Sequence, residues 1–356
     1  MFELMNPPTS PFNIFVLFLA LLQNGLKGED WRSFEDLNGR KLEAKVISVL
    51  GERAKVLRKS DRRIVPLPFN MLIEADREYL RNWKAEPLSG SNAEEEDDGD
   101  NVSSRLYPRT KVEIKAKTRE IENRRPPKGV SKEYQDSINQ LNIYRYLSGV
   151  PADVVTTPEL IANCEAAAQA CLKHGGLSHD IGNFTNKCNL HQGRGLESSL
   201  SGFIGDPGAN NRERRGHRRW CLDYPMGKSA FGQEKGFVAM WAMDQSGKKP
   251  TDSWSYPGRG FYPQVRVHGN AWSLYLTQNA PPKDQLTVEL FKLPNRPERA
   301  YGRSSKIPGK QLPTEYVSVY DNAINFEPDS STLGNGIYWV RIHGGGISEG
   351  YVVELY

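Results

Sequence analysis

The chain has 356 residues, which is longer than one hydrophobic core usually supports, so the sequence predicts two or three domains. Hydrophobic residues make up 38% and charged residues 25% of the chain, as in ordinary globular proteins. The formal net charge is +4. This small excess argues against a broad basic surface for nucleic acid or acidic membranes, and we expect no nucleic-acid partner.

The first predicted element is an apolar run at Asn13–Leu22, with polar sequence on both sides. A bilayer-spanning helix needs about 20 apolar residues, whereas a shorter run suits a secretory signal. We therefore predict a signal peptide over residues 1–28 and a secreted, periplasmic or cell-surface location, with no transmembrane helix beyond the signal. The positive residues that usually precede such a run are missing, so an uncleaved anchor or a buried N-terminal helix stays open.

Residues 31–83 are predicted to form a small β-rich module. The stretch KLEAKVISVLGERAKVLRK alternates apolar and polar residues on both sides of Gly51-Glu52, as a half-buried hairpin does, and EADREYLRNW is typical of a short closing helix. The stretches WRSFEDLNGRKLEAKVISV and LRKSDRRIVPLPFNMLIEADREYL resemble the Sla homology domain, an SH3-like barrel. The resemblance implies binding of a protein or peptide. A purely structural spacer is the alternative.

Residues 84–130 are predicted to be a disordered linker. The segment Ser89–Ser104 is acidic and lacks large apolar residues, and a basic stretch follows it. Such polar segments cannot bury enough apolar surface to offset the entropy lost on ordering. Cation binding by the acidic run is the alternative to a solvated tether.

Residues 131–245 are predicted to form a helical central domain, followed by strands. Ser131 is a suitable N-cap for a helix that extends to Gly149, and a second helix begins after Thr157 and ends at Gly175. From about Phe231 the apolar period becomes that of strands. Strand-like runs between Pro/Gly turns then predict an all-β, sandwich-like extension over residues 254–356.

All four cysteines lie in the central region, at Cys164, Cys171, Cys188 and Cys221. The first two are seven residues apart on the second predicted helix, so their Cα atoms lie roughly 10 Å apart and cannot bridge each other. Any disulfide would join one of them to Cys188 or Cys221. Four buried thiols are the alternative.

Three side chains of this region are candidates for a cleft or metal site: His179 in GGLSHD, Glu197 in GLESSLSG and His217 in RRGHRRW. Neutral imidazole and carboxylate are good zinc ligands, and two histidines with one carboxylate leave a position for water. The spacing matches no established metal motif. For each histidine, the structural alternative is a polar cap or a hydrogen-bonded, half-buried ring.

The segments LNIYR, EAAAQACLKHGGLSHD, GLESSLSG and GHRRW occur in the order typical of the CAP superfamily of cysteine-rich secretory, antigen five and pathogenesis-related proteins, and residues 132–243 resemble its bacterial members. The resemblance implies an αβα sandwich with two histidines and two acids around a cleft that sometimes binds a divalent metal. His179 matches the first histidine, Glu197 the first acid and His217 the second histidine.

Two departures from the family pattern affect this site. The first-acid motif usually reads Gly-Glu-Asn, whereas this chain has Leu196-Glu197-Ser198. The second acid has no clear match, and Asp206 and Glu213 are candidates because they precede His217. Two further histidines are weaker alternatives to His179, namely His174 and His191.

The segment RERRGHRRW, residues 212–220, surrounds His217 with five arginines. We expect His217 to point into the cleft and Arg218 or Arg219 to form ion pairs at its rim. Binding of a polyanion is the alternative.

The sequence as a whole predicts the α+β class, with a CAP-type αβα sandwich between an SH3-like barrel and a β-sandwich. No serine has a visible base and orienting group, so we expect an exported binding protein that takes a small ligand, lipid, glycan or divalent metal such as zinc in its cleft. One alternative is a metal-assisted hydrolase of peptide or cell-wall material, with zinc on His179 and His217. An intracellular adaptor is the other.

Overall fold

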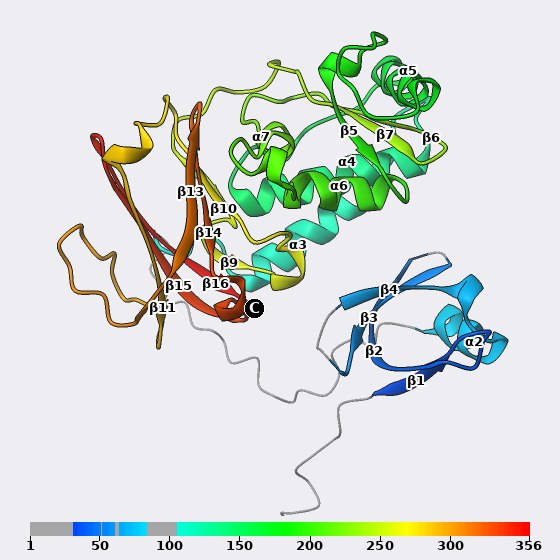
Figure 1. Ribbon diagram of the computed structural model, residues 1–356, viewed down its shortest axis with the longest axis horizontal. Helices are drawn as coiled ribbons and strands as arrows, with labels where there is room; N and C mark the ends of the chain where they lie inside the picture. Colours follow the sequence, from blue (N-terminus) through cyan, green and yellow to red (C-terminus); the bar gives the residue numbers. More distant parts are fainter. Residues whose placement is uncertain (1–30, 51, 61–63, 84–104) are drawn as a thin grey trace, which may run out of the picture. The chain divides into compact units, whose positions relative to one another are not determined.

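The computed structural model describes residues 31–50, 52–60, 64–83 and 105–356 (Figure 1). The predicted signal peptide and the acidic run at Ser89–Ser104 lie outside these residues. The chain divides into two compact units, residues 1–98 and residues 99–356. Both units combine helices with antiparallel strands, which confirms the predicted α+β class.

The first unit is a sheet with the strand order β1-β2-β3-β4 and one closing helix. Its elements are β1 (Arg32–Glu35), β2 (Lys41–Leu50), β3 (Arg53–Arg58), β4 (Ile64–Pro68), the 3-10 turn η1 (Phe69–Met71) and α2 (Glu74–Asn82). β2 and β3 form the predicted hairpin. Phe34, Val56 and Leu80 are fully buried between the sheet and α2. Buried Asp76 fastens α2 to β1, because its carboxylate pairs with Arg32 at 2.7 Å.

The helical part of the second unit consists of three layers. Its elements are α3 (Lys111–Glu122), α4 (Lys132–Ser148), α5 (Pro158–His174), η2 (Thr185–Lys187), β5 (Cys188–Gln192), α6 (Leu196–Gly205), η3 (Ala209–Asn211), α7 (Gly216–Cys221), β6 (Phe231–Glu234) and β7 (Phe237–Trp241). Figure 1 shows α5 on one side of the sheet β5-β7-β6, with α4 and α6 on the other.

The sequence of β7, FVAMW, fits this buried position. Phe237 and Ala239 join the apolar cluster beneath α5, whereas Val238 and Met240 join the cluster that contains α4 and α6. Successive side chains of a strand point to opposite faces, so a strand covered on both faces has an uninterrupted apolar run. The sheet is therefore the middle layer.

The two long helices begin and end where the sequence predicts. Ser131 caps α4 by accepting a hydrogen bond from the backbone of Tyr134, and Thr157 caps α5 in the same way. Both helices end at a glycine in the left-handed conformation, Gly149 with φ 83° and Gly175 with φ 79°. Residues other than glycine are strained there.

The second half of the predicted linker is folded, which corrects the expectation of disorder over residues 84–130. Helix α3 buries Ile114 and Ile121 on one side. Its start is fixed by a capping box, in which Glu113 N donates to Thr110 Oγ1 at 3.1 Å and Thr110 N donates to the Glu113 carboxylate at 2.7 Å. The charged residues occupy the exposed side of α3. The two buried isoleucines, seven residues apart, are the apolar signal that the charged composition of this segment outweighed.

The C-terminal part contains two sheets, with the orders β13-β14-β10-β8 and β12-β11-β15-β16-β9. Trp272 of β10 and Tyr338 of β15 bring these sheets into contact, with ring centroids 5.7 Å apart. The strands are β8 (Trp254–Tyr256), β9 (Gly260–Tyr262), β10 (Trp272–Tyr275), β11 (Thr287–Leu293), β12 (Lys310–Leu312), β13 (Thr314–Tyr320), β14 (Ala323–Pro328), β15 (Gly336–Gly344) and β16 (Ile347–Leu355), and the 3-10 turns are η4 (Gln264–Arg266), η5 (Lys283–Gln285) and η6 (Ser330–Thr332).

The helical and C-terminal parts share one apolar cluster, which contains Leu147 of α4, Phe203 of α6 and Trp272 of β10. The chain passes close to α4 at Gly258, where a Cβ atom would lie 1.8 Å from the carbonyl oxygen of Leu147. Only glycine fits such an approach. The predicted central domain and C-terminal extension, which meet at residues 245–254, therefore share one hydrophobic core. Among the described residues, no helix has the length and apolar character needed to cross a bilayer.

Candidate functional site

The candidate site begins at the end of α6, where Asp206 holds His217. Asp206 is fully buried and adopts the left-handed conformation that ends the helix, with φ 44°. One carboxylate oxygen lies 2.7 Å from His217 Nδ1, and the other accepts from the backbone N–H of His217 at 2.9 Å. A carboxylate only accepts, so Nδ1 carries a proton, and whenever the ring is neutral Nε2 keeps its lone pair.

A second histidine, His191, lies beside this pair. It is half-buried on β5, and its ring packs edge-on against Phe203, with centroids 5.9 Å apart. The ring of Phe203 also packs against His217, at 5.4 Å. Burial, and next the charge of His217, lower the pKa of His191. We refer to His191 and His217 as the histidine pair.

Two glycines and Asn189 surround the rings of the histidine pair. A Cβ atom at Gly193 would lie 2.4 Å from His191 Nε2, and one at Gly202 would lie 3.2 Å from its Cε1. Asn189, two residues before His191 on the same face of β5, donates to the carbonyl of His217 at 3.0 Å. Strand β5 and helix α7 are thus fixed to each other on the side of the sheet that faces α6.

The other predicted histidines lie elsewhere. His179 is exposed in the loop between α5 and β5, and the hydrogen bonds that the described residues give it are to Thr185. In that loop Asn183 and Phe184 both have positive φ, 48° and 66°. His174 is the exposed last residue of α5. The structure therefore brings His191, the weaker alternative in sequence, to His217, and keeps His179 within its own loop.

Two of the candidate acids, Glu197 and Asp206, lie at opposite ends of α6. Glu197 is the second residue of the helix and Asp206 follows its last residue. At 1.5 Å per residue, their backbones are about 14 Å apart. The side chain of Glu197 lies outside the described structure. The side chain of Glu213 is exposed, and its carbonyl accepts from Ser318 and Asn325, so Asp206 is the acid that contacts His217.

The described side chains contain no group of three or more His, Cys, Asp or Glu arranged to hold a metal. His217 Nε2 has the environment of a metal ligand, because its other ring nitrogen is oriented by a carboxylate. A metal on the histidine pair would need its remaining ligands from water or from a bound molecule. Zinc thus stays a prediction for this site.

The arginines around His217 support the site from within the fold. Arg218 is fully buried; it donates to the carbonyls of Ile204 at 2.5 Å and Gly205 at 3.2 Å, and to Ala271 beyond β9 at 2.8 Å. Arg215 donates to the carbonyl of Asp206 at 2.6 Å. Cations suit the C-terminal end of a helix, whose last carbonyls lack partners.

The same segment is joined to the C-terminal sheets by ion pairs. Glu327 of β14 is 4% exposed and pairs with Arg215 and, at 2.7 Å, with Arg212. Arg219 pairs with Asp321 at 2.7 Å, as expected for one of the two rim arginines. Arg218 binds backbone carbonyls, so Arg219 is the member of the two that forms the ion pair. These contacts favour a structural role for the segment over polyanion binding.

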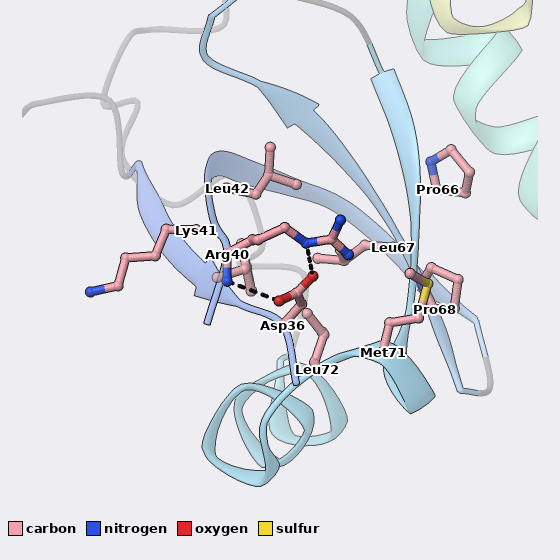
Figure 2. A pocket seen from close by; sticks show the side chains of 10 residues that line it. Asp36, Arg40, Lys41, Leu42, Pro66, Leu67, Pro68, Met71 and Leu72 are labelled. Atoms are coloured by element: carbon pink, nitrogen blue, oxygen red, sulfur yellow. Dashed lines mark hydrogen bonds and ion pairs between the residues drawn. The ribbon is translucent and has the colours of Figure 1, made fainter. Parts of the chain in front are cut away.

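The first unit has a separate pocket between β1, β2 and β4. Figure 2 shows Arg40 and Asp36 side by side at this pocket, with Leu42, Leu67 and Met71 around them. Arg40 Nε donates to the Asp36 carboxylate at 2.7 Å, and the backbone N–H of Arg40 lowers the pKa of Asp36. The pocket thus has a mostly apolar lining and a charged rim.

Comparisons with protein-family models, curated proteins and solved structures find no match to this chain. The assignment of the site therefore depends on the geometry above.

The histidine pair predicts a specific titration. We expect His191 to titrate below 6.5, and replacement of His217 by glutamine to raise the pKa of His191 only partly, because burial, the larger cause, remains. With its pKa lowered on folding, His191 contributes most stability above pH 6.5, and this contribution is lost as the pH falls toward the lowered pKa. The measurement is the pH dependence of the imidazole NMR signals. His179→Gln is the control, and an equal shift in that variant would contradict the pairing.

Proposed function

We propose that the protein is an exported binding protein of the CAP type, with its ligand held at the histidine pair. The observation that carries the proposal is the Asp206–His217 contact, at 2.7 Å, with His191 packed on the same phenylalanine. The side chain of His217 is 26% exposed. The ring of His217 is thus reachable from solvent and held in place by Asp206, as a binding site requires.

Three features support the CAP assignment. The sheet β5-β7-β6 is covered by α5 on one face and by α4 and α6 on the other, in keeping with an αβα sandwich. The GHRRW motif forms α7 and turns its histidine toward an acid. That acid, Asp206, precedes the histidine in the chain, as the second acid of the family pattern should.

The chemistry of the pair defines the ligands it suits. Two neutral imidazoles offer nitrogen lone pairs to a divalent metal such as zinc, and the protonated pair would attract an anionic group of a small ligand, lipid or glycan. We infer that His191 takes the place that the resemblance gave to His179. The pocket of the first unit, with Asp36 and Arg40 at its rim, supports the proposal that this unit binds a peptide or protein.

A metal-assisted hydrolase is the second candidate. The observation that favours it is again the Asp206–His217 contact, because a histidine whose Nδ1–H is held by a buried carboxylate keeps the Nε2 lone pair for a metal ion. Bound zinc would supply a water of lowered pKa. His191 and His217 would hold the metal, and Asp206 would fix the tautomer of His217.

Calorimetric titration of the full chain with zinc at neutral pH tests the site. We expect stoichiometric binding that weakens about tenfold or more in His191→Ala and in His217→Ala, because each removes a ligand. His179→Ala is the matched control and should bind as the unaltered chain does. Binding should also weaken below about pH 6.5, where free imidazole is protonated.

Each other outcome has a defined meaning. Loss of zinc binding in His179→Ala alone would restore the ligand set implied by the family and contradict the histidine pair. Binding that all three variants retain would place the metal elsewhere. If the unaltered chain does not bind zinc, the metal-assisted hydrolase is excluded for zinc, and the binding function rests on direct contact between the pair and an organic ligand.

A further inference from the structure

Two of the four cysteines meet between α5 and the sheet. Cys164 lies in the middle of α5, Cys188 is the first residue of β5, and both are buried, at 0% and 4% exposure. They belong to the same apolar cluster, which lies on the α5 side of the sheet. The cysteine side chains in the described residues are all free thiols.

The backbone contacts place these two thiols next to each other. Cys164 Sγ donates to the carbonyl of Ala230 at 3.5 Å, and the same carbonyl accepts from the N–H of Trp241 at 2.9 Å. Trp241 is the direct partner of Cys188 in the antiparallel register. The Cys164 thiol is therefore held over the strand position beside Cys188.

The other two cysteines are excluded as partners of Cys164 by position. Cys171 lies two turns further along α5, about 10 Å from Cys164 along the helix. Cys221 of α7 contacts Met240 Sδ at 3.7 Å and Asn189 at 3.8 Å. Met240 and Asn189 point to the face of the sheet opposite to that of Trp241 and Cys188, because successive side chains of a strand alternate. The sheet thus separates Cys221 from Cys164.

We propose that Cys164 and Cys188 form a disulfide when the chain folds in an oxidising compartment. The oxidant is a disulfide, either of a small thiol or of an oxidase. One cysteine thiolate attacks it and releases one thiol, and the second cysteine then attacks the mixed disulfide and releases the other. Two thiols of the chain are oxidised, one external disulfide is reduced to two thiols, and the two protons from the chain end on these leaving groups.

The reaction belongs to the folding phase, before the core closes. In the folded chain both sulfurs are shielded from solvent, and burial raises the pKa of Cys164. The bond would link α5 to β5 and enclose the loop of His179. Because Cys188 lies three residues before His191, it would also fix the start of the strand that carries the histidine pair.

The test is refolding of the full-length chain from denaturant, once in a buffer of oxidised and reduced glutathione and once with reductant alone. Free thiols are then alkylated under denaturing conditions and counted by mass. We expect two free thiols after oxidative refolding and four after reduction. Cleavage after Glu165 separates Cys164 from Cys171, so peptide mapping assigns the bond. The oxidised chain should unfold at a temperature about 5–10 °C higher.

Single serine variants provide the controls. Cys171→Ser and Cys221→Ser should keep the cross-link, whereas Cys164→Ser and Cys188→Ser should lose it. The double variant with alanine at positions 164 and 188 reports whether the chain folds without either thiol, by its circular dichroism. Four alkylated thiols in the oxidatively refolded chain, or a cross-link that survives in Cys164→Ser, would overturn the proposal. The test does not depend on the ligand of the histidine pair, so it can fail while the proposed function stands.

Discussion

Replacement of Arg145 by methionine is expected to lower the free energy of unfolding by about 3–5 kcal/mol. Arg145 of α4 is fully buried, and its guanidinium donates to a set of backbone carbonyls at 2.8–3.3 Å, those of Pro151, Cys221, Asp223, Tyr224 and Met226. Burial lowers the pKa of Arg145 to about 10, so the group remains a cation at neutral pH. Methionine fills much of the volume but leaves these carbonyls without their donor.

Denaturant unfolding followed by circular dichroism measures this change. Arg125→Met is the control, because Arg125 is exposed, and there the free energy of unfolding should change by less than about 0.5 kcal/mol. Equal stability of the two variants would contradict the structural role assigned to Arg145. It would mean that water can replace the guanidinium as the donor to the carbonyls that follow α7.

Replacement of Glu327 by alanine is expected to destabilise the second unit by about 3 kcal/mol or more and to disturb the candidate site. The carboxylate lies between Arg212 and buried Arg215, so its loss leaves the Arg215 cation unpaired inside the protein. Arg215 also holds the carbonyl of Asp206. We therefore expect the imidazole NMR signals of His217 to move, although Glu327 belongs to the C-terminal sheets.

The control removes the same charge from the neighbouring strand. Glu315→Ala on β13 alters an exposed carboxylate, and both stability and the His217 signals should stay close to those of the unaltered chain. If Glu327→Ala lost stability without moving the His217 signals, the ion pair would join the two parts of the unit but would not position the site.

Local signals in the sequence predicted many elements correctly. The N-caps at Ser131 and Thr157, and the glycines that end both helices, act within one turn of chain, so they are visible in sequence. The β2–β3 hairpin was visible because its alternation spans both strands. Helix α3 was missed because its two buried isoleucines lie within a strongly charged stretch, although their i, i+7 spacing was the available signal.

The candidate site was predicted only in part. His217 and Asp206 were both named, but the choice between Asp206 and Glu213 needed the end of α6, where the chain turns and buries one carboxylate. His191 had no motif. The signal that could have favoured it is its position in a strand, two residues after Asn189 and followed by Gly193, where a side chain on that face meets α6.

The sequence by itself determined the α+β class, the capped helices and the hairpin, because propensity, capping and apolar period are encoded over a few residues. Only the tertiary structure decided which residues meet. It placed His191 and His217 on the same phenylalanine and Cys164 over the strand position beside Cys188. It also turned the arginines of RERRGHRRW inward onto α6 and the C-terminal sheets. These contacts join segments far apart in the chain, and their distances depend on how helices and sheets pack, which no local pattern records.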